Sequence, residues 1–419
     1  MGSNKYSSMK FNRKISPDLK VQPNFITKKR LKEDEINFDK LRSYRLDRVK
    51  SELKKNNLEA CILFDPVNVR YALDTVNMSV YNMHNLTRYC FVPVEGPVIL
   101  YEYFNCEGLS SHLNLINEIR PAITWDYFSN GDQASEQLKK WINEIKDLSN
   151  SYFKSKKVAI DVINGPAVTA LNKASIDVVD AKLILEQARV IKSAEELKCM
   201  KAAVEVAEIG VARMRNELKA GMTEDELWSI LHKTNIEHGG EWIECRILSS
   251  GERTNPWMQE SSNKIIQSGE IVSFDTDMVG PYGYCADISR AFVEGNKFSD
   301  EQKKLYSMAV DQINHNYRII KPGVSFKEFT ERSWTLPDEY YGNRYSVMLH
   351  GIGMCDEWPA IRYPTDGGQR NGQFEKNMTI TLESYIGKVG GKEGVKLEQQ
   401  YLVGENGLEL MSHHPLEDI

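Results

Sequence analysis

The stretch from Ile271 to Phe292 constrains the fold more than any other part of the chain. It reads IVSFDTDMVGPYGYCADISRAF, an apolar run interrupted by three aspartates and by a Gly-Pro-Tyr-Gly sequence that is a strong turn signal. We expect a hairpin whose two strands both present carboxylates near the turn. Acidic side chains among Ile, Val and Phe are costly to bury unless a cation compensates them. The stretch therefore indicates the floor of a metal site, and a solvated acidic hairpin tip is the alternative. The three aspartates are Asp275, Asp277 and Asp287.

Length and composition predict a soluble protein of two domains. The chain has 419 residues, of which 41% are hydrophobic and 27% are charged, both ordinary values for globular proteins. A net charge of -6 gives no reason to expect a nucleic-acid partner. The seven cysteines form no Cys-x-x-Cys pair, so we expect reduced thiols and a cytoplasmic location. No apolar segment is long enough for a membrane span, and the N-terminus lacks the apolar core of a signal peptide.

Three regions differ in their pattern. Residues 1–40 form a basic extension with interspersed apolar residues, which we expect to contact a neighbouring domain or subunit; a nucleic-acid arm is the alternative. Residues 41–188 alternate between short apolar runs and helical patterns, which predicts a three-layer α/β domain. A capping box at Ser193-Ala-Glu-Glu196 then starts the first helix of a third region, residues 189–419. Within the second region we expect helices at 41–54 and 135–148 and strands at 59–64, 89–92, 97–103 and 157–161.

The third region contains an internal echo. Residues 218–227 and 320–329 have nearly the same residue types, in the order helix end, glycine cap, Ser or Thr N-cap and new helix. Each copy is followed by strands that carry acids, the first copy by the three aspartates and the second by Glu383 and Glu398. This predicts two α/β halves related by a pseudo-twofold axis, although capping chemistry alone also produces short echoes. A pair of metal ions at the junction of the halves would explain the matching acids.

One histidine, His350, lies between the two acidic groups in the sequence. It ends an apolar run that begins at Tyr345, which we expect to be a strand, and a Gly-Ile-Gly turn follows it. One imidazole with several carboxylates suits two Fe, Mn, Zn or Co ions. The six predicted metal ligands are Asp275, Asp277, Asp287, His350, Glu383 and Glu398.

These motifs, in this order, resemble those of the pita-bread metallopeptidase superfamily, which includes creatinase, prolidase and methionine aminopeptidase. The matching segments are 283–290, His350-Gly-Ile-Gly and Gly394-Val-Lys-Leu-Glu398, and 189–193 is similar to the linker of these two-domain proteins. The resemblance implies a mixed α/β (α+β) fold. A creatinase-like three-layer α/β domain would be followed by a pseudo-twofold catalytic domain with a dinuclear metal site.

The departures from the peptidases point to another reaction. In the peptidases one ligand aspartate stands eleven residues before the next, whereas here Asp277 stands ten and Asp275 twelve residues before Asp287. Two histidines that assist peptide hydrolysis are also replaced, by the segment 255–257 and by Asp356. An Xaa-Pro dipeptidase or creatinase-like metallohydrolase, the main rival function, would need those histidines. A non-catalytic binding module is a second rival, which the complete ligand set disfavours.

This set of departures resembles the DddP subfamily, whose members are dimethylsulfoniopropionate lyases. The resemblance implies a homodimer, two iron ions, a small zwitterionic substrate, and dimethyl sulfide and acrylate as products. In a β-elimination, metal ions would hold the substrate carboxylate while a base removes the neighbouring proton. We expect Asp356 to be the base and Tyr345 to orient the substrate. Aromatic faces attract cations such as the sulfonium, and the candidates for this lining are Trp257, Tyr282 and Trp358.

Overall fold

The computed structural model describes residues 28–367 and 371–417, so most of the predicted basic extension, residues 1–27, lies outside the described residues. The described chain forms two compact units, Phe38–Arg189 and a second made of Lys28–Asn37 with the part after Val190. All seven cysteines are free thiols, as expected. Within the described residues, no helix is both long and apolar enough to cross a membrane.

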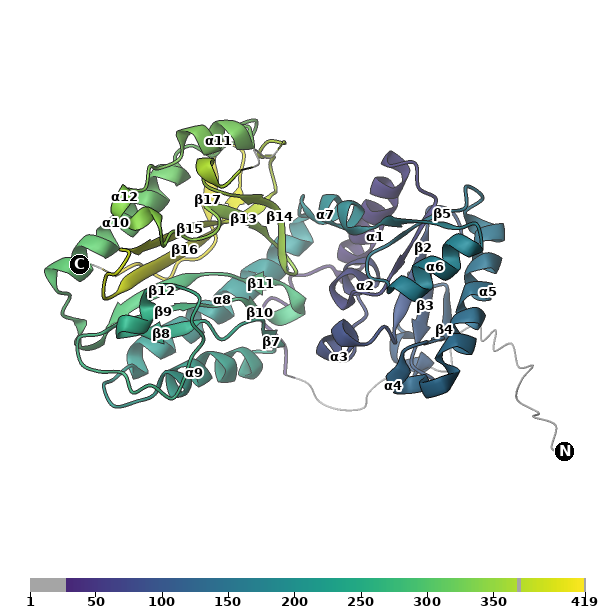
Figure 1. The fold of residues 1–419 in the computed structure, drawn as a ribbon, viewed down its shortest axis with the longest axis horizontal. Coiled ribbons are helices and arrows are strands. Elements are labelled where there is room, and N and C mark those ends of the chain that lie inside the picture. Colours follow the sequence, from purple (N-terminus) through teal and green to yellow (C-terminus); the bar gives the residue numbers. More distant parts are fainter. Residues whose placement is uncertain (1–27, 368–370, 418–419) are drawn as a thin grey trace. The chain divides into compact units, whose positions relative to one another are not determined.

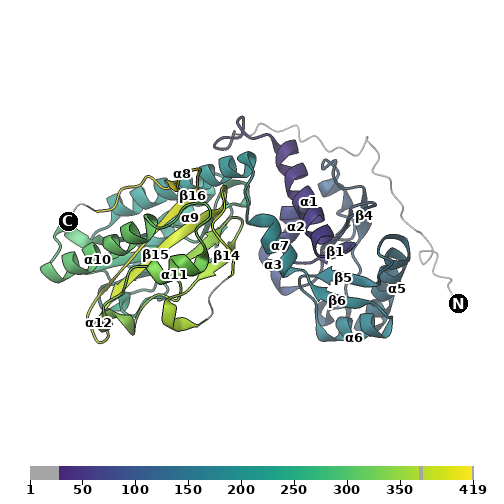
Figure 2. The same ribbon diagram turned by 90° about the horizontal axis from the view of Figure 1, so that it is seen from above.

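The first unit is a three-layer α/β domain, as predicted. Its six-stranded sheet has the order β4-β3-β2-β1-β5-β6. Helices α1, α2 and α7 lie on one face of the sheet and α5 and α6 on the other (Figures 1 and 2). The strands are β1 (Ala60–Leu63), β2 (Tyr89–Pro93), β3 (Ile99–Glu102), β4 (Glu118–Pro121), β5 (Lys157–Ile160) and β6 (Asp177–Asp180). The helices are α1 (Phe38–Lys55), α2 (Pro66–Leu73), α3 (Ser79–His84), α4 (Tyr127–Asn130), α5 (Ala134–Tyr152), α6 (Gly165–Lys173) and α7 (Lys182–Arg189).

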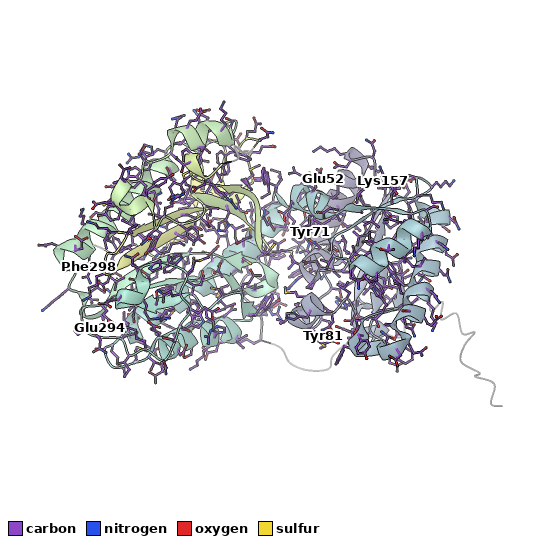
Figure 3. The ribbon with its side chains drawn as sticks, viewed as in Figure 1. Glu52, Tyr71, Tyr81, Lys157, Glu294 and Phe298 are labelled. Atoms are coloured by element: carbon purple, nitrogen blue, oxygen red, sulfur yellow. The ribbon has the colours of Figure 1, made fainter. Side chains whose placement is uncertain are left out.

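Aromatic side chains fill the core between this sheet and α5. Trp141 is fully buried, and its ring centroid lies 4.4 Å from that of Trp125. Tyr89 and Tyr101 stack on neighbouring strands, also at 4.4 Å. On the opposite face, Tyr71 (labelled in Figure 3) donates its hydroxyl to the carbonyl of Ala188 at 2.8 Å, which joins α2 to α7. Buried aromatic groups contribute large apolar areas, so this unit has a complete hydrophobic core of its own.

The second unit contains two helix pairs, each followed by strands. Helix α10 packs on β15 and β16, and α8 packs on β10 and β11. The helices are α8 (Ala194–Glu217), α9 (Glu224–Glu237), α10 (Asp300–Tyr317), α11 (Phe326–Arg332) and α12 (Asp338–Tyr341). The strands are β7 (Trp242–Ile243), β8 (Leu248–Ser250), β9 (Ile271–Asp275), β10 (Met278–Val279), β11 (Cys285–Ala286), β12 (Ser289–Val293), β13 (Leu349–Ile352), β14 (Asp356–Ile361), β15 (Thr379–Gly387), β16 (Gly394–Val403) and β17 (Leu408–Leu410).

The internal echo predicted from the sequence is present in the helix pairs. Gly221 and Gly323 follow the first helix of each pair with φ of 94° and 88°, the left-handed region that glycine adopts without strain. Thr223 and Ser325 then cap the second helices by accepting the backbone N–H three residues on. The capping box predicted at Ser193 is also formed. The copies differ in length, because α11 has 7 residues and α9 has 14.

Strand β16 joins the sheets of the two halves. One sheet has the order β12-β9-β8 and the other the order β14-β13-β15-β16-β17. Arg290, on β12, is fully buried and donates to the carbonyl of Glu398 on β16 at 2.8 Å. Asp287 donates its backbone N–H to the side-chain oxygen of Gln400 at 3.0 Å. These bonds hold the acid-bearing strands of both halves against each other.

Candidate metal centre

The predicted hairpin is confirmed, and its ladder is broken where the aspartates lie. Strands β9 and β12 pair with Asp275 opposite Ser289, and β10 and β11 pair nearer the turn. Between these two short ladders lies Asp277, whose φ is 34°. Asp287 falls in the same break on the returning chain, outside both ladders. A residue without cross-strand pairing is free to turn its side chain out of the sheet, so the break aims both carboxylates to one side.

Strands β15 and β16 supply the two glutamates from the second half. Glu383 and Glu398 stand directly opposite each other in the ladder. Side chains alternate along a strand, so Lys396 and Glu398 share a face, while Val395 and Leu397 point into the hydrophobic core. Like charges directly opposite each other destabilise a sheet. A cation between these strands removes that cost.

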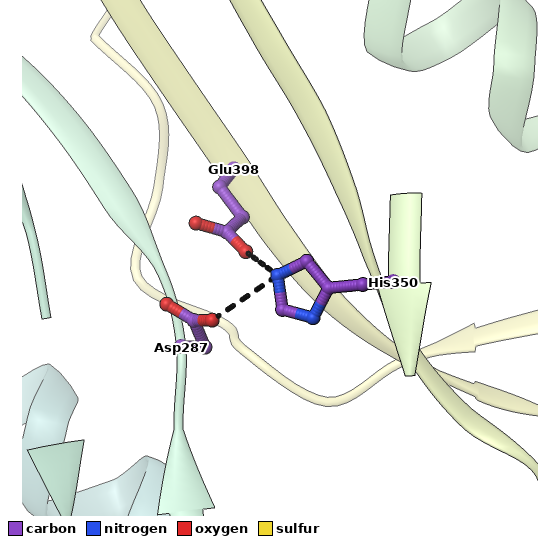
Figure 4. A group of neighbouring side chains, drawn as sticks. All are labelled: Asp287, His350 and Glu398. Atoms are coloured by element: carbon purple, nitrogen blue, oxygen red, sulfur yellow. Dashed lines mark ion pairs between the residues drawn. The ribbon is translucent and has the colours of Figure 1, made fainter. Parts of the chain in front are cut away.

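His350 lies inside a strand and does not end one, which corrects our expectation. Strand β13 begins at Leu349, and Tyr345 lies in irregular chain before it. The Nδ1 atom of His350 donates to the carbonyl of Gly351 at 2.9 Å. A carbonyl can only accept, so Nε2 is the nitrogen available to a metal ion. Figure 4 shows Nε2 directed at Asp287 and Glu398, at 3.5 and 3.7 Å.

All six predicted ligands come together. Their ligand atoms form two groups in which every atom lies within 4.8 Å of the others, and both groups contain Asp287. The sixth residue, Glu383, joins through the Nε2 atom of His350 at 3.2 Å. Two overlapping groups with a shared carboxylate are what a dinuclear centre requires. The groups are Asp275, Asp277 and Asp287, and Asp287, His350 and Glu398.

Lys396 lies in the middle of this cluster, and sequence reasoning missed it. Its side chain is fully buried. The Nζ atom lies 2.9 Å from Asp275, 2.8 Å from Glu383 and 3.1 Å from Glu398. It also donates to the hydroxyl of Ser289 at 2.5 Å. The sequence could have indicated this position, because Lys396 stands two residues before Glu398 on a predicted strand and side chains two residues apart face the same side.

Several carboxylate oxygens of the cluster are buried without a hydrogen-bond donor among the described residues. Among the described residues, none donates a hydrogen bond to Oδ1 of Asp275, Oδ1 of Asp287 or Oε1 of Glu398, although all three atoms are buried. Burial and neighbouring carboxylates raise the pKa of Asp287 and of Glu398 well above the usual range. Buried oxygens that lack a donor and destabilise one another's charge fit divalent metal ions.

The pKa values of Asp275 and Asp277 in the hairpin shift in opposite directions. Burial would raise the pKa of Asp275, but the charge of Lys396 and the hydrogen bonds from Glu398, Lys396 and Ser289 together outweigh burial and lower that pKa to about 2. For Asp277, burial together with the charge of Asp275 outweighs the lowering influences of Cys245 and Lys396 and raises the pKa to about 7. Asp277 thus has more need of a metal ion to hold it ionised.

The predicted base, Asp356, stands at the rim of the cluster. Its side chain is 66% exposed, and its Oδ1 atom lies 3.6 Å from Nδ1 of His350, on the edge of the ring opposite the other carboxylates. Desolvation by the surrounding protein and the charges of Glu383 and Asp275 raise the pKa of Asp356, against a lowering influence of His350. The next residue, Glu357, anchors this turn through a buried ion pair with Lys192 at 2.7 Å.

The predicted aromatic residues separate into two groups. Tyr345 and Trp257 lie at the cluster, with ring centroids 4.8 and 5.6 Å from the Nζ atom of Lys396. Tyr282 instead donates its hydroxyl to the carbonyl of Leu31 at 2.7 Å and so packs the segment Lys28–Asn37 onto this unit. Trp358 makes an edge contact with Phe326, 5.9 Å between ring centroids, in the hydrophobic core.

Asn255 has a structural role in the segment 255–257, which we expect to replace a histidine-containing segment of the peptidases. The side chain of Asn255 donates to the carbonyls of Lys388 and Gly391, at 2.8 and 3.0 Å, and accepts from Tyr385 at 3.0 Å. Among the described residues, His350 is the only histidine that forms part of the metal-ligand groups. The cluster of predicted ligands therefore contains a single imidazole among its carboxylates.

Comparison with known proteins defines the class. Residues 198–405 match the sequence profile of Metallopeptidase family M24. The structure of an Xaa-Pro dipeptidase from Bacillus anthracis superposes with a TM-score of 0.74 at 20% identity, covering 90% of this chain and 99% of that one. The profile match and the similarity in fold make the second unit a pita-bread domain of the M24 type.

Two relatives narrow the family. The dimethylsulfoniopropionate lyase DddP of Roseovarius nubinhibens is 36% identical over 388 residues, which covers 90% of this chain and 87% of the relative. DddP of Roseobacter denitrificans is 33% identical over 387 residues, 90% of this chain and 86% of the relative. The chain belongs to the DddP family within the M24 fold, which confirms the family predicted from the motifs.

Proposed function

We propose that this protein cleaves dimethylsulfoniopropionate to dimethyl sulfide and acrylate. The observation that carries the proposal is that the six predicted metal ligands lie together with His350 as the one imidazole in the described ligand groups. Membership of the DddP family supports the same reaction. A β-elimination needs positive charge beside a carboxylate and a base beside the neighbouring carbon, and it needs no activated water.

In this proposal, substrate binding by metal ions and removal of the proton take place on opposite edges of the His350 ring. Bound metal ions would supply the positive charge that holds the substrate carboxylate and stabilises the negative charge developing next to it. The six residues from Asp275 to Glu398 would hold these ions. Asp356, on the other edge of the ring, takes the proton from the carbon next to the carboxylate. The carbon–sulfur bond then breaks with its electron pair leaving on sulfur, so the product is neutral and needs no acid.

Tyr345 and Trp257 supply aromatic surface for the sulfonium. Both rings already lie within cation–π distance of an ammonium, that of Lys396. Burial and the charge of Glu383 raise the pKa of Tyr345, so its hydroxyl stays protonated and can donate to the substrate.

Iron is the metal we propose, with a homodimer in the cytoplasm as the working form. A donor set of carboxylates with one imidazole suits iron, manganese, zinc or cobalt. The choice of iron and of the homodimer rests on the resemblance to DddP. Metal analysis of the purified protein and its mass by light scattering test both points directly.

Headspace analysis tests the reaction. Purified protein loaded with iron(II) is sealed with dimethylsulfoniopropionate, and dimethyl sulfide in the gas phase is measured together with acrylate in solution. We expect both products in equal amounts, and neither after chelation of the metal. The rival hydrolase function is tested with an Xaa-Pro dipeptide under the same conditions. Release of proline without any dimethyl sulfide would reject the proposal.

A further inference from the structure

Lys396 offers the carboxylate cluster a cation that belongs to the chain. Its Nζ atom lies between 2.8 and 3.1 Å from one oxygen of each of three predicted ligands, Asp275, Glu383 and Glu398. These ligands come from both halves of the unit. For two of them the second oxygen, Oδ1 of Asp275 and Oε1 of Glu398, receives no hydrogen bond from the described residues. Asp275 and Glu398 therefore face Lys396 with one oxygen and keep the other available to a metal ion.

The surroundings of Lys396 hold its charge in place. The side chain is fully buried, and the ring centroids of Tyr345 and Trp257 lie 4.8 and 5.6 Å from the ammonium. Ser289 links the ammonium to Glu398, because it accepts from Lys396 at 2.5 Å and donates to Glu398 at 2.9 Å. An ammonium enclosed in this way cannot swing into water when a second cation arrives.

The charges of the cluster make Lys396 a competitor of the metal. The five carboxylates and the ammonium together carry four negative charges when all are ionised, which two divalent ions neutralise. Without Lys396 the same cluster would carry five negative charges and would attract the two ions more strongly. Like charges a few Å apart in a buried site repel strongly, and the ammonium shares its carboxylates with the metal.

We propose that Lys396 is a resident cation of the metal centre, which weakens metal binding and stabilises the metal-free protein. In the metal-free state it compensates carboxylates that would otherwise repel one another across β9, β15 and β16. In the loaded state the same ammonium repels the ions. The centre can then lose and regain metal without unfolding. This inference concerns metal affinity, so it stands or falls separately from the substrate.

The test compares Lys396→Met, which keeps length and removes the charge, with Lys396→Arg, which keeps the charge. Binding of manganese(II) alone is measured on the full chain by the loss of its free-ion EPR signal. We expect Lys396→Met to bind at least about tenfold more tightly than the unmodified protein, and Lys396→Arg to bind within about threefold of it. Weaker binding by Lys396→Met would overturn the proposal, because it would mean that Lys396 mainly orders the ligands.

Thermal unfolding gives a second readout. In the absence of metal, Lys396→Met should have a lower melting temperature than the unmodified protein, and manganese(II) should raise the melting temperature of the variant by more. If the substitution lowers the melting temperature equally with and without metal, Lys396 is a purely structural residue and the proposal is rejected. If the variant is recovered only with metal, slower extraction by a chelator than from the unmodified protein supports the proposal, and faster extraction rejects it. A variant that folds in neither state also rejects it.

Discussion

At the scale of single residues, the imidazole of His350 lies between the predicted metal ligands and the proposed base. Its Nε2 edge faces Asp287, Glu383 and Glu398, between 3.2 and 3.7 Å away. Its Nδ1 edge donates to the carbonyl of Gly351 and has Asp356 at 3.6 Å. Metal binding and proton removal can therefore be changed independently, because the ring keeps the base off the ligand side.

Asp356→Asn should remove elimination while leaving the metal content unchanged. The amide keeps the size of the side chain but cannot accept the proton, and a positioned base contributes about 10²- to 10⁴-fold to rate. The measurement is dimethyl sulfide production together with metal content by elemental analysis. Asp338→Asn, an exposed aspartate in α12, is the matched control and should retain full activity. An active Asp356→Asn protein would show that another group removes the proton.

The six predicted ligands lie together in the structure, but some of their surroundings differ from those expected from the sequence. Their proximity was predictable because acidic side chains in apolar strands are costly to bury without a cation. The alternation of side chains along β16 would have placed Lys396 on the same face as Glu398, but its contacts with β9 and β15 come only from the tertiary structure. Tyr282 was predicted as pocket lining from its neighbours in sequence, yet a turn with φ of 65° at this residue directs it to the segment around Leu31.

At the scale of elements, helix α8 supports the hairpin from behind. Gly280, at the start of the hairpin turn, lies so close to α8 that an added Cβ would meet the Cβ and Cα of Ala203 at 2.7 and 2.8 Å. The Cα is backbone within a 24-residue helix, so it cannot move aside locally. The turn must shift instead, and Asp277 lies only three residues before it.

Gly280→Ala should therefore destabilise the second unit and weaken metal binding together. We expect a loss of about 1–3 kcal/mol in unfolding free energy, typical of overpacking, measured by urea denaturation, with weaker manganese(II) binding. The control is Gly165→Ala in α6, where an added Cβ meets nothing within 4 Å. That variant should be neutral or more stable by up to about 1 kcal/mol. Destabilisation without any change in metal affinity would mean that α8 does not position the hairpin carboxylates.

Helix ends were easier to predict than strand ends. The caps at Ser193 and Thr223 follow from local hydrogen bonds that the sequence itself encodes. Strand β13 was predicted to begin near Tyr345, but it begins at Leu349, because pairing with β15 and not residue type decides where a strand starts. The break between the two hairpin ladders was likewise beyond sequence reasoning, although it is what turns Asp277 and Asp287 out of the sheet.

At the scale of the whole molecule, the predicted metal ligands all lie in one unit. All six predicted ligands and Lys396 lie after Val190, and each unit has its own hydrophobic core. A ligand that binds only the folded state stabilises the unit that forms its binding site. At a ligand concentration about a thousandfold above the dissociation constant, it raises the unfolding free energy of that unit by about 4 kcal/mol. Metal should thus stabilise the second unit and not the first.

Hydrogen exchange with mass spectrometry tests this on the intact chain. Loading with manganese(II) at that excess should slow exchange in β9, β12, β15 and β16 by about a thousandfold, where exchange requires unfolding of the unit. The sheet β1–β6 is the internal control and should exchange at the same rate with and without metal. In Lys396→Met, the exchange rates of the second unit with and without metal should differ by more, since the metal-free state of this variant lacks the resident cation. Equal protection of both sheets would mean that the two units unfold as one, and that metal binding stabilises the whole chain.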